Sequence, residues 1–170
     1  MLTFFVVALA LTVSGFADES SFPLKDLGPT IDEILGSQKP DETEFSYVAA
    51  RGSALYLSIS AYLENNPSGR PGEAETSSKF MQHSHHFAVV AEVFGRLKGK
   101  STESVYEQIQ MLMGIYSKEM GESKQLNNEI MSPPILRDFK DLERIAPVIE
   151  GLFKMMEKQN SDSTGTKPNP

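Results

Sequence analysis

The sequence predicts an all-α protein in which four long helices form an up-down-up-down antiparallel bundle, with a short helix on an N-terminal arm. Two observations lead to this prediction. Apolar residues recur at alternating steps of three and four in four separate stretches, which is the spacing of one buried helix face. Short connections rich in glycine, proline or asparagine separate the stretches, and helices joined by short loops pack as antiparallel neighbours.

An apolar segment without a charged side chain, residues 1–17, opens the chain. Gly15 and Ala17 are small residues at the positions that a signal peptidase recognises, which predicts a signal peptide cleaved before Asp18. A retained membrane anchor is the alternative, although roughly a dozen apolar residues fall short of the ~20 that span a bilayer. We therefore expect an exported protein without stable membrane insertion after cleavage.

Charge and composition exclude several partners and chemistries. The net charge of −7 opposes binding to nucleic acid. The chain has no cysteine, which excludes disulfides, thiol chemistry and covalent haem attachment. An exported chain without disulfides or a glycosylation sequon is more typical of a bacterial protein, periplasmic or secreted, than of a eukaryotic one.

Residues 18–41 are predicted to form the N-terminal arm, because prolines interrupt them at positions 23, 29 and 40. Pro29 can start a helix and Gly36 can end one, so we expect a short helix over residues 30–35.

The bundle is predicted to span residues 42–158. Its first helix, over 42–64, has Asp41 as its N-cap and a small-sided middle that lets a neighbour approach closely. The second runs from residue 71 or 73 to 98. Its inner stripe consists of Phe80, His83, Phe87, Val90, Phe94 and Leu97.

The third helix begins after Ser101 and turns polar from Gly121, where it either breaks or continues exposed; we favour continuation. The fourth begins at Pro133 and contains Pro147, which is expected to kink it. That kink either repacks or opens a gap for a small apolar ligand near Gly151. Residues 159–170 have almost no apolar side chain and are predicted to be a disordered tail.

The most specific chemical signal is a histidine cluster in the second helix. His83 and His86 are three residues apart and share a helix face, so two imidazoles can hold one Cu or Zn ion, with Met81 as a candidate soft ligand. No acidic residue accompanies the pair at ligand spacing, so the alternative is a pair of core histidines that bind no metal. The residues required for haem or for a di-iron centre are missing, and without a metal the sequence predicts no cofactor.

Arg51, in the small-sided middle of the first helix, is the second candidate. With Tyr47 and Tyr56 it can offer hydrogen-bond donors to an anionic ligand. The alternative is an arginine that reaches solvent or pairs with a glutamate at position 44, 75 or 92.

The sequence contains no catalytic motif, and we predict no catalytic residue. The favoured function is therefore non-enzymatic: a partner-binding, small-ligand-binding or structural module whose partner is an unknown protein or small molecule. The alternative function is a transition-metal or redox-linked binding protein that uses the pair His83 and His86. An enzyme is the third reading.

Overall fold

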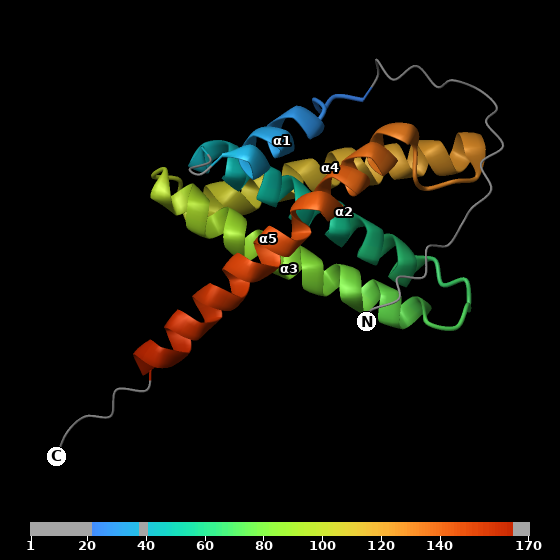
Figure 1. Cartoon of the computed structure of the whole chain (residues 1–170). Helices are drawn as coiled ribbons and strands as arrows, with labels where there is room; N and C mark the ends of the chain where they lie inside the picture. Colours follow the sequence, from blue (N-terminus) through green and yellow to red (C-terminus); the bar gives the residue numbers. More distant parts are fainter. Residues whose placement is uncertain (1–21, 38–40, 165–170) are drawn as a thin grey trace.

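The computed structural model describes residues 22–37 and 41–164, with side chains up to residue 159. Over these ranges it is all-helical, as predicted. The described helices are α1 (Gly28–Gly36), α2 (Glu42–Asn65), α3 (Glu73–Leu97), α4 (Thr102–Asn127) and α5 (Pro133–Thr164) (Figure 1). The predicted signal peptide and its cleavage site lie outside the described residues. No helix in the described part combines the length and hydropathy needed to cross a bilayer.

Local signals in the sequence set where the helices begin. Asp41 Oδ1 accepts hydrogen bonds from the amides of Thr43 and Glu44, and the Ser101 side chain accepts one from the Ser104 amide. These bonds satisfy amides that a helix start leaves free. The fifth helix begins at Pro133, where a missing amide hydrogen costs nothing.

Helix α2 is the centre of the molecule and contacts each of the other four helices (Figure 1). It is buried almost continuously from Phe45 to Ser60. The dominant contact is with α3, whereas the last turns of α5 extend away from the other helices. The up-down-up-down order of the four long helices stays a prediction.

Hydroxyl groups fix the register of α2 against α3. Serines at every seventh residue of α2 hydrogen-bond to partners that descend by seven along α3, so the two helices are antiparallel. The pairs are Ser46 Oγ with the Ala91 carbonyl (2.9 Å), Ser53 Oγ with Ser84 Oγ (3.2 Å) and Ser60 Oγ with Ser77 Oγ (2.9 Å). Between them, a Cβ atom on Gly52 would lie 2.2 Å from the Phe87 ring, so only glycine fits.

The structure also differs from the sequence prediction at two helix ends. α5 continues to Thr164, so the disordered tail was wrong from residue 159 to that point. The good helix formers Glu157 and Lys158 lead into this stretch, and although its serine, asparagine, aspartate and threonine residues are weaker helix formers, no proline or glycine interrupts it before Gly165. On α3, Leu97 is 63% exposed rather than part of the inner stripe, because the helix ends there.

Other expectations are confirmed. α4 continues through Gly121 to Asn127. Phe87 is fully buried, and Phe80 and Phe94 pack half-buried against the core.

Candidate metal centre

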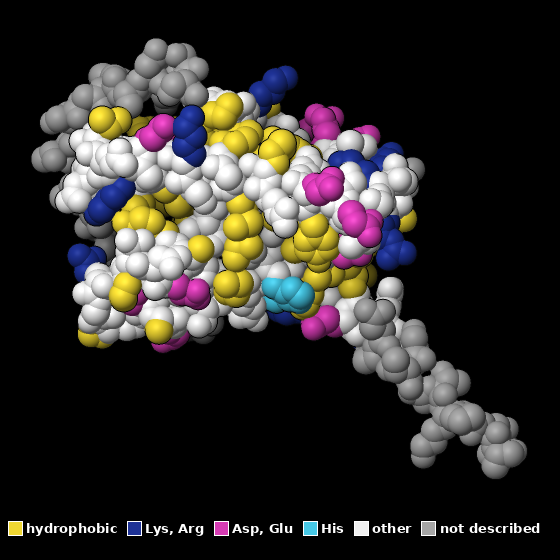
Figure 2. Space-filling view, turned by 180° about the vertical axis from the view of Figure 1, so that it is seen from behind, with side chains coloured by type: hydrophobic (Ala, Val, Ile, Leu, Met, Phe, Trp, Pro, Cys, Tyr) yellow, Lys and Arg dark blue, Asp and Glu magenta, His cyan; other side chains and the backbone are white. Residues whose placement is uncertain are grey.

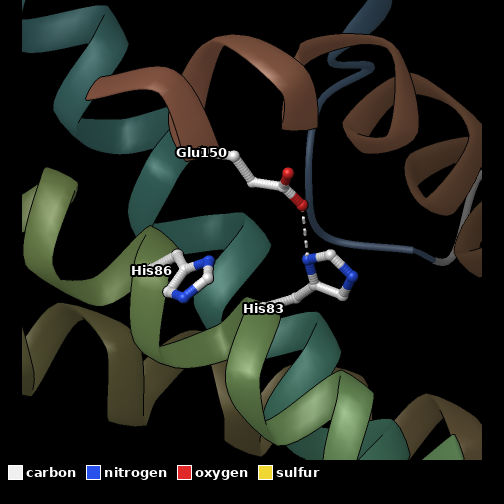
Figure 3. A group of neighbouring side chains, drawn as sticks. All are labelled: His83, His86 and Glu150. Atoms are coloured by element: carbon white, nitrogen blue, oxygen red, sulfur yellow. Dashed lines mark ion pairs between the residues drawn. The ribbon is translucent and has the colours of Figure 1, made fainter. Parts of the chain in front are cut away.

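His83 and His86 lie one turn apart on α3, and Glu150 reaches them from α5 (Figure 3). One nitrogen of each imidazole and one carboxylate oxygen all lie within 4.8 Å of one another. His83 Nδ1 is 3.3 Å from Glu150 Oε1. The histidine pair was predicted from its spacing. Glu150 was not, because it belongs to a helix far along the chain.

Both histidines have a ring nitrogen without a hydrogen bond. The Nδ1 atoms of His83 and His86 are shielded from solvent and have no hydrogen-bond partner among the described residues. Six side-chain atoms in the described part are in this situation, and two of them belong to this one cluster. Buried polar atoms nearly always have a partner, so these two nitrogens are candidates for binding an ion or another ligand.

The spacing of the donor atoms is close to that of a metal centre. Around a zinc ion with ligands at about 2.0–2.1 Å, tetrahedral donor atoms lie roughly 3.3–3.5 Å apart. The contact between His83 and Glu150 already has this length. The largest separation, up to 4.8 Å, must shorten by side-chain rotation. All three side chains are only partly buried, which leaves room for such rotation.

Aromatic neighbours hold the two imidazoles in place. The His86 ring stacks on Phe153 of α5, with ring centroids 4.1 Å apart, and the Tyr56 ring of α2 lies 5.5 Å from that of His83. Burial lowers the pKa of His86, although Glu150 opposes the shift. His86 is therefore favoured in the neutral form that binds metal ions.

A cavity of about 350 Å³ opens beside His86, between α3 and α5. Its lining consists of Gln82, His85, His86, Phe153, Lys154 and Glu157. Figure 2 shows histidine at the surface of the molecule, beside hydrophobic side chains. A gap had been predicted near Pro147 and Gly151; the cavity lies further along α5, and neither residue lines it.

The other predicted site residues have different surroundings. Met81 is 41% exposed, and its position two residues before His83 turns it away from the pair on a helix. Tyr56, predicted beside Arg51 as a ligand-binding residue, packs against His83 instead. Tyr47 is partly buried against the core.

Arg51 is completely buried and forms a cluster with Tyr116 of α4 and Asp138 of α5. Its Nε donates to Tyr116 Oη (2.9 Å) and Asp138 Oδ2 (3.1 Å), and its Nη2 pairs with the same carboxylate oxygen. Tyr116 Oη also donates to Asp138 Oδ2 (2.6 Å), and Arg51 Nη1 donates to the Lys25 carbonyl (2.5 Å). The predicted pairing with a glutamate on the first or second helix was wrong, because the carboxylate comes from α5.

The charges in this cluster compensate each other. Burial lowers the pKa of the Arg51 guanidinium, but Tyr116 and Asp138 outweigh it, so the net shift is upward. Burial raises the pKa of the Asp138 carboxyl, against the opposing effect of Arg51. The guanidinium thus meets a carboxylate of its own chain, and the role of Arg51, Tyr47 and Tyr56 in ligand binding stays a prediction.

Comparisons of this chain with protein-family models, with curated proteins and with solved structures found no match. Functional inference therefore depends on the two polar clusters and the cavity themselves.

Proposed function

We propose that this chain is an exported helical protein, without enzymatic activity, that binds a divalent transition-metal ion at His83, His86 and Glu150. The observation that carries the proposal is the convergence of one donor atom each from His83, His86 and Glu150 within 4.8 Å, together with a shielded Nδ1 on each imidazole that makes no hydrogen bond. Two nitrogen donors and one oxygen donor suit Zn²⁺ or Cu²⁺. Cu(I) is less favoured, because it prefers sulfur ligands and Met81 is turned away from the pair.

The proposal also covers where the protein is located, how its helices are arranged and what else it binds. Export to the periplasm or the medium is supported by the apolar segment at residues 1–17. An up-down-up-down bundle is supported by the antiparallel serine register of α2 and α3 and by the short connection from α3 to α4. Binding of a small molecule or protein partner is favoured by the cavity beside His86.

The test is a metal titration of tag-free protein after treatment with a chelator. Competition with a chromophoric chelator measures the affinity for Zn²⁺ and Cu²⁺ in the native chain and in His83→Ala, His86→Ala and Glu150→Gln. The matched control is His85→Ala, which removes a neighbouring histidine outside the ligand group. We expect each ligand variant to lose about 10-fold or more in affinity, and the control to keep the native value.

Two results would contradict the proposal. One is an affinity of the native protein no higher than that of a variant lacking both His83 and His86. The other is an equal loss in His85→Ala, which would indicate unspecific binding by surface histidines. A circular dichroism spectrum of each variant checks that the helices are intact.

A further inference from the structure

The proposed metal ion would have one coordination position that the protein does not fill. Zn²⁺ in proteins is usually four-coordinate, and sites with three protein ligands leave the fourth position to water or to an exogenous ligand. Three donors converge here, from His83, His86 and Glu150. The side chains of His83 and Glu150 are 37% and 35% exposed, so the site lies close to the surface, although the Nδ1 atoms of the two imidazoles are themselves shielded.

The cavity between α3 and α5 adjoins the ligand group at His86. His86 belongs both to the ligand group and to the cavity lining. The volume of about 350 Å³ lies within the range of about 300–1,000 Å³ that is usual for small-molecule sites. A ligand bound to the metal therefore has space for the rest of its body next to the His86 ring.

The lining favours an anionic head group on an apolar body. Phe153, stacked on His86, provides an aromatic surface within the cavity. Lys154 lines the cavity and has no ion pair among the described residues, while Glu157 opposes its charge. A divalent ion bound to Glu150 keeps one net positive charge, so the complete site is cationic. Carboxylate oxygen is a good fourth ligand for such an ion.

We propose that the metal ion at His83, His86 and Glu150 binds a small organic carboxylate as its fourth ligand, with the apolar part of that molecule against Phe153 in the cavity that Lys154 also lines. This inference rests on the proposed metal function. It adds the class of the ligand and the place where it binds.

Co²⁺ serves as the probe metal, because its visible absorption depends on its coordination. The full-length, tag-free protein is first loaded with Co²⁺ and then titrated with acetate and with benzoate. We expect a saturable spectral change with both anions, at lower concentration for benzoate because its ring packs on Phe153. Lys154→Ala is expected to weaken anion binding about 2- to 5-fold, as for a partly screened surface charge. Lys140→Ala, an exposed lysine earlier on α5, is the matched control and should bind like the native protein.

The outcomes separate the two proposals. A Co²⁺ spectrum that appears but does not respond to either anion overturns this inference and leaves the metal site intact. An equal anion affinity in Lys154→Ala and Lys140→Ala overturns the placement in the cavity. Failure to bind Co²⁺, Zn²⁺ or Cu²⁺ overturns the proposed function, and this inference with it.

Discussion

Two polar clusters join α5 to the rest of the molecule, and they differ in how many of their polar atoms have a hydrogen-bond partner. Arg51, Tyr116 and Asp138 are fully buried, and their opposite charges meet; only Asp138 Oδ1 lacks a hydrogen bond. His83, His86 and Glu150 are half-exposed and leave two imidazole nitrogens without a hydrogen bond, one of which lies 3.3 Å from the Glu150 carboxylate. The first cluster is a closed part of the core. The second is incomplete, and a bound cation would complete it.

The largest expected effect on stability distinguishes Asp138 from Glu150, the α5 carboxylates of the two clusters. Asp138→Ala leaves a buried guanidinium without its counter-charge, which we expect to lower the free energy of unfolding by about 3–5 kcal/mol. Glu150→Ala removes a half-exposed carboxylate. In metal-free protein it should change the free energy of unfolding by less than about 0.5 kcal/mol. Urea denaturation followed by circular dichroism measures both. Equal losses would mean that the two clusters do not differ as described.

The next effect is stabilisation by a bound metal ion, which is expected only for the cluster of His83, His86 and Glu150. Zn²⁺ at 100 times its dissociation constant should raise the free energy of unfolding by about 2.7 kcal/mol, because it binds only the folded chain. Glu150→Ala should lose about half of this gain or more at the same Zn²⁺ concentration, as expected for an affinity at least about 10-fold lower, and His85→Ala should keep it. The measurement is the urea midpoint with and without Zn²⁺. Equal stabilisation of both variants would place the ion elsewhere.

A smaller effect tests how closely α2 packs against α3, the helix that carries the histidines. Gly52→Ala puts a methyl group against the Phe87 ring and should cost about 1–3 kcal/mol through overpacking of α2 on α3. The matched control is Gly121→Ala in α4, where nothing lies within 4 Å of the new Cβ atom. It should stabilise the protein by about 0.5–1 kcal/mol, because alanine is the better helix former. Thermal unfolding checks both predictions, because the midpoint should fall for Gly52→Ala and rise for Gly121→Ala.

Local signals in the sequence were sufficient for much of the fold. The caps at Asp41 and Ser101, the helix start at Pro133 and the shared face of His83 and His86 all follow from residues within one or two turns. Such interactions are encoded over a few positions. They can be read without knowing how the helices pack.

The partners supplied by α5 could not be predicted in the same way. Asp138 and Glu150 meet α2 and α3 only after the chain has folded back, and many surface carboxylates have similar sequence neighbourhoods. The central place of α2 was missed for a related reason. Its serines look like a solvated face in the sequence, yet Ser46 and Ser60 are buried, because each hydroxyl has a partner on α3. A seven-residue serine repeat was the signal that could have indicated this.

Pro147 separates the part of α5 that belongs to the Arg51 cluster from the part that belongs to the histidine cluster. It lies between Asp138 and Glu150 and has no amide hydrogen, so the carbonyl four residues earlier loses its usual helical donor. We therefore expect the helix to bend more easily at Pro147 than elsewhere. If the proposed ion binds, a shift of Glu150 beyond Pro147 would not have to displace Asp138, which is buried with Arg51. On that proposal, binding at the surface would leave the packing of the core unchanged.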